Sequence, residues 1–192
     1  MAHEIEVVNG VARMMFVGAT PWHGLGKRLE TPPASVQEAL EMAGLAGWEV
    51  VLQPLYLADG RKVDQFATVR KRDGAVLGNG GGSHSRVVQH ETALAPFDAF
   101  LRAGAATVET AGSLKGGCKV WLLAKIAKPD AVIVPRADDR VAQYMVVATS
   151  HDGSIAVSFQ ATPIRVVCQN TLSAAMGNGK GAMRIRHTAG AA

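Results

Sequence analysis

WEVVLQPLYLADGRKVDQFATVRKRDGAVLG, residues 48–78, contains the clearest local folding signals of the chain. The pairs Asp59-Gly60 and Asp73-Gly74 separate three runs that are rich in β-branched and aromatic residues. An Asp-Gly pair between such runs favours a tight β-hairpin turn. Together with the helical segment ETALAPFDAFL (91–101), the pattern predicts a three-stranded meander backed by a helix. Such a unit buries one face and leaves the other free for a partner.

Helices are predicted on both sides of this meander. In SVQEALEMAGLAG (35–47), Ser35 and Glu38 have the spacing of a capping box and precede an apolar stripe of helical period. Apolar residues also recur at three-and-four spacing through residues 162–176, with Thr162 as the expected N-cap. Both segments are therefore predicted to be helical.

Two further hairpins complete the expected fold. AATVETAGSL and GGCKVWLLAKI turn around residues 115–117, and AQYMVVATS and SIAVSFQA turn around residues 151–153. The fold class is therefore predicted as α+β, with an antiparallel meander and hairpins, helices packed on one face, and a β-β-β-α core. Residues 1–177 are expected to form a single domain, and the glycine-rich, basic segment 178–192 a flexible tail or linker.

Composition limits the classes of protein that the chain can represent. Its 192 residues are 48% hydrophobic, which is enough for a buried core, and the net charge of +4 permits a polyanionic partner without requiring one. Cys118 and Cys168 fit neither a disulfide scaffold nor a four-ligand zinc site, so we expect a reducing compartment. Glu4 and Glu6 stand where a signal peptide would be apolar, and no apolar run reaches the length of a membrane span. We therefore expect a cytoplasmic protein with no membrane contact.

No spacing in the chain assembles a catalytic triad, a carboxylate pair or a metal site. We interpret His23 as bonding to the backbone of its loop, and we expect Trp22 to bury its ring there. The glycine-rich segment Gly78–Ser85 lacks both the following helix and the Lys-Ser/Thr pair of a phosphate-binding loop. It is predicted to be a flexible connection between strands, and no cofactor is indicated.

One predicted strand combines basic and aromatic side chains on a single face. Lys119, Trp121 and Lys125 alternate with apolar residues, so they project to the same side. Such a face suits a nucleic-acid platform, on which an aromatic ring stacks on bases and cations meet phosphates. The alternative is a strand whose lysines are solvated while Trp121 covers the edge of the core.

Three motifs carry a resemblance to a known family. TPWHGLGKRL (20–29), AGSLKGGCKVWLLAKI (111–126) and SHDGS…TPIRVVCQNTLSAAM (150–176) occur in this order. Over residues 2–177 the chain resembles the uncharacterised phage/plasmid-like proteins of bacteriophages, plasmids and their hosts. It departs from their pattern at Ser85, near the position of a tyrosine in the family, and at Gln89-His90, where members tend to have Gln-Asn.

The order of the predicted elements is also similar to the β-β-β-α core of single-strand annealing recombinases. That resemblance implies a homo-oligomeric ring or filament that holds single-stranded DNA by its backbone and promotes annealing in recombination without nucleotide hydrolysis. The residues then expected to meet DNA are basic side chains of the meander and the second hairpin, with Trp121 as the stacking ring: Arg61, Lys62, Arg70, Lys71, Arg72, Arg86, Lys115, Lys119 and Lys125.

Two other functions stay open. The chain could be a metal-dependent hydrolase or a nucleic-acid-modifying enzyme that brings together His23, His151 and Asp152 on folding. Stoichiometric zinc or manganese in the purified protein would favour this hypothesis. It could also be a non-catalytic host-interaction protein, which would be monomeric and indifferent to DNA.

Overall fold

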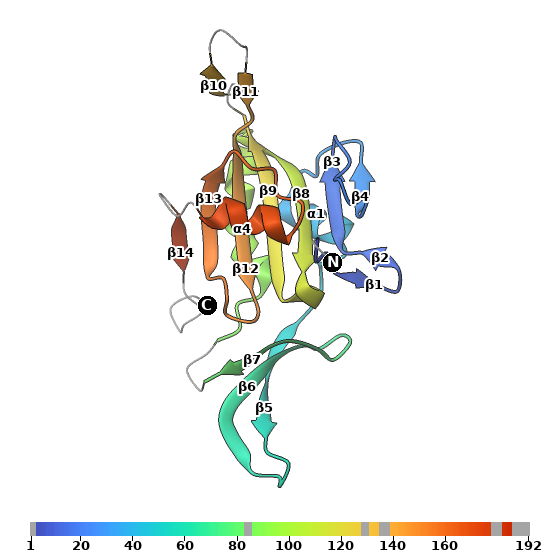
Figure 1. Cartoon of the computed structure of the whole chain (residues 1–192), viewed down its shortest axis with the longest axis vertical. Coiled ribbons are helices and arrows are strands. Elements are labelled where there is room, and N and C mark those ends of the chain that lie inside the picture. Colours follow the sequence, from blue (N-terminus) through green and yellow to red (C-terminus); the bar gives the residue numbers. More distant parts are fainter. Residues whose placement is uncertain (1–2, 83–85, 128–130, 135–138, 178–181, 186–192) are drawn as a thin grey trace.

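The computed structural model describes residues 3–82, 86–127, 131–134, 139–177 and 182–185 (Figure 1). Its largest element is a seven-stranded sheet. In their order across the sheet, the strands are β14 (Met183–Ile185), β13 (Val157–Thr162), β12 (Tyr144–Ser150), β9 (Lys119–Ile126), β8 (Ala106–Leu114), β3 (Met14–Val17) and β4 (Lys27–Leu29). Neighbouring strands are antiparallel except β3 and β4, which are parallel. The predicted α+β class, built on antiparallel sheets, is confirmed.

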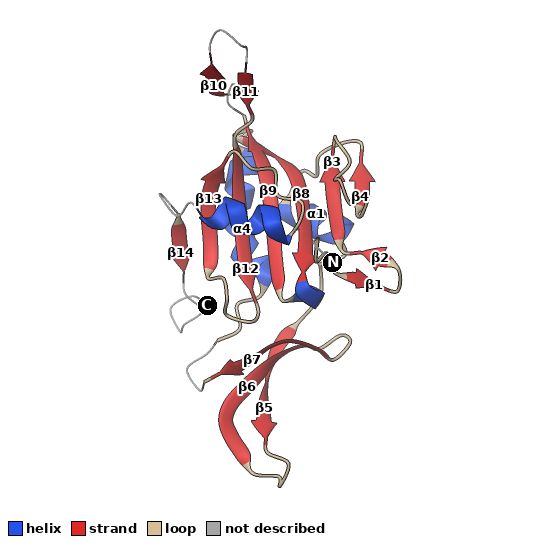
Figure 2. Cartoon of the chain, viewed as in Figure 1, coloured by secondary structure: helices blue, strands red, loops and turns tan. Residues whose placement is uncertain are grey.

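The sheet is buried on both faces because its central strands are apolar on both sides. Along β9, Val120 and Leu122 belong to one core cluster, whereas Trp121 and Leu123 belong to the other. Helices lie over both faces of the sheet (Figure 2), which corrects the prediction that they pack on one face. The first cluster is covered by α1 (Val36–Met42), α2 (His90–Leu94), the 3-10 helix η1 (Ala95–Phe97) and α3 (Asp98–Arg102), and the second by α4 (Gln169–Gly177).

Helix α1 begins where its capping residues predict. The Ser35 hydroxyl accepts a hydrogen bond from the Glu38 backbone N–H at 3.1 Å. The Glu38 carboxylate in turn accepts from the Ala34 N–H at 2.7 Å, one residue before the expected position. Two N–H groups at the start of the helix are thus satisfied, as in a capping box.

The predicted meander is confirmed as a separate three-stranded sheet. It consists of β5 (Val50–Tyr56), β6 (Lys62–Arg70) and β7 (Ala75–Gly81). Gly60 and Gly74 occupy its two turns with φ of +83° and +70°, which glycine adopts without steric cost. The meander projects from one end of the body (Figure 1).

The helical segment after the meander packs elsewhere than expected. Helix α2 lies against β12 and α3 against β8, so both cover the seven-stranded sheet and not the meander. Leu94 and Phe97 are fully buried in the core beneath that sheet. Only the base of the meander, through residues such as Val50 and Leu77, joins the same core. The expected β-β-β-α unit is therefore corrected, because the large sheet offers the helices more apolar surface.

The predicted helix over residues 162–176 begins only at Gln169. Before it, Val166, Val167 and Cys168 are buried without helical structure. The Thr171 hydroxyl accepts hydrogen bonds from the N–H groups of Val167 and Cys168 at 2.9 and 3.0 Å. The apolar spacing of the first half thus reflects the burial of a loop, and the expected N-cap at Thr162 is wrong.

Two segments that were predicted to be flexible contain strand. Strand β7 runs to Gly81, so residues 78–81 of the predicted glycine-rich connection pair with β6, while residues 83–85 lie outside the described part. Within the predicted tail, residues 183–185 form β14 along β13. The remaining described elements are β1 (Val7–Val8), β2 (Val11–Ala12), the 3-10 helix η2 (Lys115–Gly117), β10 (Ala131–Val134) and β11 (Asp139–Val141). None of the described helices has the length and apolar character to cross a membrane.

Candidate nucleic-acid interface

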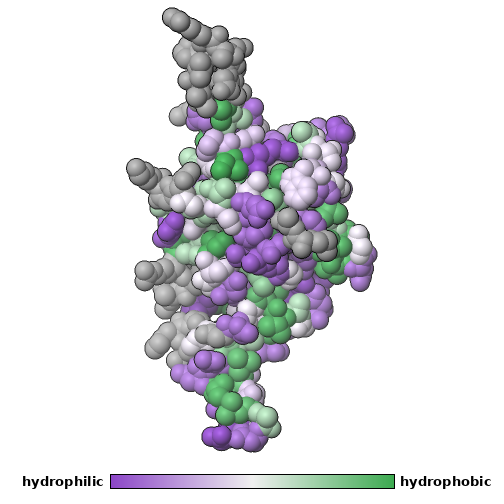
Figure 3. Space-filling model, in the orientation of Figure 1, coloured by the Kyte–Doolittle hydropathy of each residue, from purple (hydrophilic) through white to green (hydrophobic). Residues whose placement is uncertain are grey.

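The projecting meander exposes an aromatic ring beside a cation. Tyr56 lies directly opposite Lys62 in the register of β5 and β6, and 59% of Tyr56 is exposed. The Lys62 ammonium group lies 6.0 Å from the centroid of the half-buried Phe66 ring. We call Leu52, Tyr56, Lys62 and Phe66 the arm face. On the surface in Figure 3, hydrophobic and hydrophilic side chains lie next to one another along the meander.

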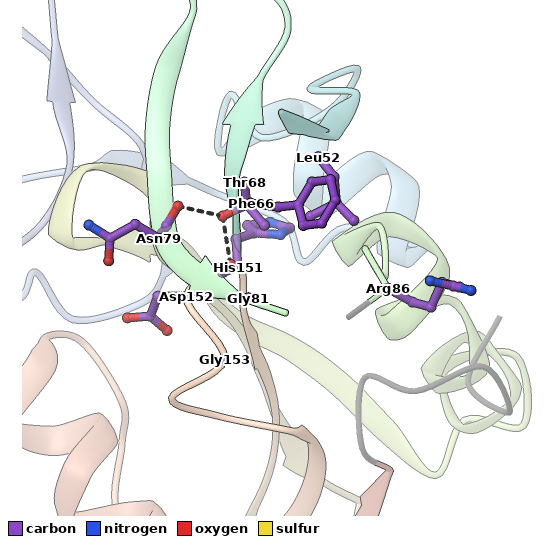
Figure 4. A pocket seen from close by; sticks show the side chains of 10 residues that line it. Leu52, Phe66, Thr68, Asn79, Gly81, Arg86, His151, Asp152 and Gly153 are labelled. Atoms are coloured by element: carbon purple, nitrogen blue, oxygen red, sulfur yellow. Dashed lines mark hydrogen bonds between the residues drawn. The ribbon is translucent and has the colours of Figure 1, made fainter. Parts of the chain in front are cut away.

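At its base, the arm face runs into a cavity of about 200 Å³ between the meander and the β12–β13 turn. Figure 4 shows Leu52 and Phe66 together on the meander side of this junction pocket. Its polar lining comes from Thr68, Asn79, Arg86, His151 and Asp152. The pocket therefore joins an apolar wall to groups that can bind polar parts of a ligand.

The meander is held against the β12–β13 turn by close backbone contact. The Thr68 hydroxyl donates a hydrogen bond to the His151 carbonyl at 2.7 Å. A Cβ atom on Gly78 would lie 2.5 Å from the Asp152 Cα, so only glycine fits at this point. This contact joins positions more than seventy residues apart in the chain, and sequence reasoning missed it.

A buried polar network fixes the base of the meander to the body. The Arg70 guanidinium donates to the carboxylates of Glu6 and Asp73 at 2.8 and 2.9 Å. The Ser113 hydroxyl donates to the second oxygen of Glu6 at 2.6 Å. The guanidinium carbon of Arg70 lies 4.3 Å from the centroid of the Trp48 ring, a cation–π contact.

This network gives Arg70 a structural role. Burial on its own would lower the pKa of Arg70, but the hydrogen bonds to Asp73 and Glu6 outweigh it and raise the pKa, so the side chain stays charged. Only 4% of Arg70 is exposed. Its predicted contact with the DNA backbone is therefore corrected to a contact that anchors the meander.

Trp121, the predicted stacking residue, is fully buried. Its indole N–H donates to the Thr110 hydroxyl at 3.2 Å, and its ring covers Gly112, where a Cβ atom would overlap the ring. The prediction that Trp121 stacks on bases is wrong, because residues of the α4 side cover this face of β9. The alternative, in which Trp121 covers the edge of the core and the lysines are solvated, holds only in that Trp121 packs on the core, because its ring is fully buried and Lys119 and Lys125 are half-buried.

The other predicted cations do not form one surface. Lys119 and Lys125 are half-buried at opposite ends of β9. The Lys115 ammonium group forms an ion pair with the Glu4 carboxylate at 3.6 Å. On the meander, Arg61 pairs with Asp59 and Lys71 with Glu49, each at 2.7 Å. Lys62 and Arg72 are exposed and form no ion pair with the described residues, and Arg86 is exposed at the junction pocket. The meander therefore presents Lys62 and Arg72 in exposed positions, and Arg86 is exposed beside it at the junction pocket.

The histidines that could have formed an enzyme site lie in separate clusters. The His23 ring accepts from the Leu25 N–H at 3.0 Å and contacts the Val167 carbonyl at 2.9 Å, which confirms its bonding to loop backbone. Trp22 beside it is 67% exposed, so the expected burial of its ring is wrong. His151 instead packs edge-on against His90 under the meander, with ring centroids 5.5 Å apart.

Two ionisable side chains near the junction, Cys118 and Asp152, have shifted pKa values. Burial raises the pKa of the Cys118 thiol, which keeps it protonated. Burial also acts to raise the pKa of Asp152, but hydrogen bonds from Ser154 outweigh it and lower the pKa. Across the described ranges, no group of three His, Cys, Asp or Glu side chains is placed to hold a metal ion.

Fold and site together define an α+β protein with a two-sided sheet and a projecting meander that carries an exposed aromatic and basic surface. The chain belongs to the family described as "Domain of unknown function (DUF932)", which matches residues 82–192. The match includes α2 to α4 and β8 to β14, and leaves β5 and β6 outside it. No curated protein and no solved structure matches the chain.

Proposed function

We propose that this protein binds single-stranded DNA through the meander and, as a homo-oligomer, promotes annealing without nucleotide hydrolysis. The observation that carries the proposal is the exposed Tyr56 ring opposite Lys62 on a sheet that projects from the body. Single-stranded nucleic acid is bound without sequence preference where aromatic rings stack on bases and nearby cations meet phosphates. Tyr56 takes the role that the sequence assigned to Trp121.

Exposed cations lie at both ends of the arm face and in the β6–β7 turn. Lys62 lies near the β5–β6 turn, and Arg86 lines the junction pocket at the other end of the arm face. Arg72 lies in the β6–β7 turn. A strand that follows the arm face passes from Lys62 along Phe66 toward Arg86, and neutralisation of its backbone leaves the bases free for pairing.

The edges of the large sheet support assembly. Strand β14 pairs only with β13 among the described strands, and its Met183 and Ile185 side chains are exposed. An edge strand with exposed apolar side chains can pair with a second chain. A ring or filament would place many arms along one DNA strand, which suits annealing, and the resemblance to phage and plasmid proteins suits recombination.

A salt titration tests the proposal. Fluorescence anisotropy of a labelled oligothymidylate is measured at increasing salt, and the logarithm of the binding constant is expected to fall linearly with the logarithm of the salt concentration. Light scattering with and without the oligonucleotide is expected to show an oligomer. A protein that stays monomeric and shows no binding at low salt would contradict the proposal and favour a host-interaction role.

A further inference from the structure

A second cavity, of about 210 Å³, lies at the base of the meander and shares no lining residue with the junction pocket. It forms where the β1–β2 turn, the residue before β3 and the β6–β7 turn come together. We call it the arginine pocket, and its lining includes Asn9, Arg13, Trp48, Arg70, Arg72 and Asp73. Three guanidinium groups thus border one cavity, together with a single carboxylate.

The positive charge of this cavity is not neutralised by its surroundings. The carboxylates of Glu6 and Asp73 both bond to Arg70. Arg13 and Arg72 form no ion pair with any residue in the described parts of the chain. Three guanidinium groups against the carboxylates of Glu6 and Asp73 leave one net positive charge, and the guanidinium groups of Arg13 and Arg72 are the ones that can meet an anion.

The backbone of Arg13 is held by hydrogen bonds on both sides, and its side chain reaches Gly44. Its backbone N–H donates to the Glu6 carbonyl at 2.8 Å, and its carbonyl accepts from the Ser113 N–H at 3.0 Å. Its guanidinium lies against Gly44, where a Cβ atom would be 2.5 Å from the nearest nitrogen. Gly44 follows the end of α1, where the helix dipole favours a cation. The absence of a side chain at Gly44 makes this approach possible.

Arg70 and Trp48 form a rigid wall on the other side. Arg70 is fixed by its two carboxylates and by the ring of Trp48, and the Trp48 N–H donates to the Gly44 carbonyl at 3.3 Å. Arg13 and Trp48 thus both contact Gly44. A site built on such fixed groups loses little conformational entropy when a ligand binds.

We propose that the arginine pocket binds a phosphate group. Planar guanidinium groups match the geometry of phosphate oxygens and bind them in pairs, and the Asn9 amide adds a neutral donor. Because water occupies about 30 Å³ in the liquid, the cavity has room for a phosphate with part of its hydration shell. The source of the phosphate is either the backbone of a DNA strand, a choice that rests on the proposed function, or a free phosphate or mononucleotide.

The test uses Arg13→Gln and Arg72→Gln in the full chain, with Arg102→Gln on α3 as the charge-matched control. Calorimetry measures the binding of inorganic phosphate and of thymidine monophosphate, and anisotropy measures oligothymidylate binding across a salt series. Thermal melting checks the fold of each variant. Arg72 is exposed in a turn, so its substitution keeps the test valid even if Arg13→Gln unfolds.

The two sources give different results. If the pocket takes a backbone phosphate, each variant weakens oligonucleotide binding about tenfold and lowers the salt slope by about 0.7, while Arg102→Gln does not. If it takes a free phosphate, saturable binding of phosphate or the mononucleotide is lost in the variants and oligonucleotide binding is unchanged. The proposed phosphate site would be contradicted if both variants bind every probe as the parent does, or if the parent binds none of the probes.

The pocket and the proposed function can fail separately. Oligonucleotide binding that depends on Tyr56 but is indifferent to both arginines, in a protein that binds neither inorganic phosphate nor thymidine monophosphate, would contradict the phosphate site and leave the proposed function standing. Phosphate binding that is lost in Arg13→Gln, in a protein that ignores oligonucleotides, would overturn the function and leave the pocket standing.

Discussion

Tyr56 and Lys62 face each other across β5 and β6, at the end of the meander that projects from the body. Residues opposite each other on antiparallel strands have their Cβ atoms about 5 Å apart, so the ring and the cation share one face. The remaining contacts of the meander are structural. Arg70 anchors it to the body, and Gly78 seats it on the β12–β13 turn.

Removal of the Lys62 charge should weaken DNA binding without affecting the fold. In Lys62→Gln, we expect oligothymidylate affinity to fall and the salt slope to decrease by about 0.7, because one phosphate contact is lost. Lys62 is exposed, so the melting temperature should stay unchanged. Anisotropy across a salt series measures both quantities, with Arg102→Gln as the control. A slope equal to that of the parent would show that Lys62 does not meet the backbone.

A methyl group at Gly78 should loosen the meander. The Cβ of Gly78→Ala would overlap the Asp152 backbone, and we expect the free energy of unfolding to fall by about 1–3 kcal/mol. Gly82→Ala is the matched control, because nothing lies within 4 Å of a Cβ atom there. Urea denaturation measures the difference. Equal stability of the two variants would mean that the close contact at Gly78 does not hold.

Loss of the Glu6 carboxylate should lower the free energy of unfolding. Glu6→Ala leaves the buried Arg70 with only one carboxylate and the Ser113 hydroxyl without its acceptor. We expect a loss of about 3 kcal/mol in the free energy of unfolding. Glu49→Ala, which removes the exposed partner of Lys71, should cost less than about 1 kcal/mol. Chemical denaturation compares the two, and a similar small cost for both would contradict the anchoring role.

Stability should fall as the pH drops through the ordinary histidine range. Burial lowers the pKa of His90, so the unfolded chain takes up a proton that the folded chain resists. Stability therefore rises with pH where the unfolded state binds more protons, and it declines below a pH of about 6.5. In His90→Gln, the slope between about pH 7 and pH 5 should be flatter than in the parent. Urea denaturation at several pH values measures it, and an equal slope in His90→Gln would contradict the prediction.

The turns and the first helix were predictable because their signals are local. Asp59-Gly60, Asp73-Gly74 and the Ser35–Glu38 box act within a few residues, and the structure has all of them. The packing of the helical segment after the meander was not predictable in the same way. Nothing in residues 91–101 indicates which of two sheets their apolar face covers, and that depends on strands that follow later in the chain.

For a related reason, the sequence predicted Trp121 as the stacking residue, whereas the exposed ring of the arm face is Tyr56. Alternation in β9 places Lys119 and Trp121 on one face whether that face is open or covered, and here the α4 side of the core covers it. Tyr56 precedes a turn and lies on a sheet that none of the described helices covers, so its ring stays exposed. The signal that could have found it is an aromatic residue directly opposite a lysine across an Asp-Gly hairpin.

The central claim is that the arm face binds single-stranded DNA through Tyr56. Its most direct test is the dissociation constant of a labelled oligothymidylate for Tyr56→Ala, compared with Phe100→Ala, which removes an exposed ring on α3. Because stacking on one base contributes about 1–3 kcal/mol, we predict that Tyr56→Ala binds about tenfold more weakly and that Phe100→Ala binds as the parent does. Equal affinity of Tyr56→Ala and the parent would contradict the account.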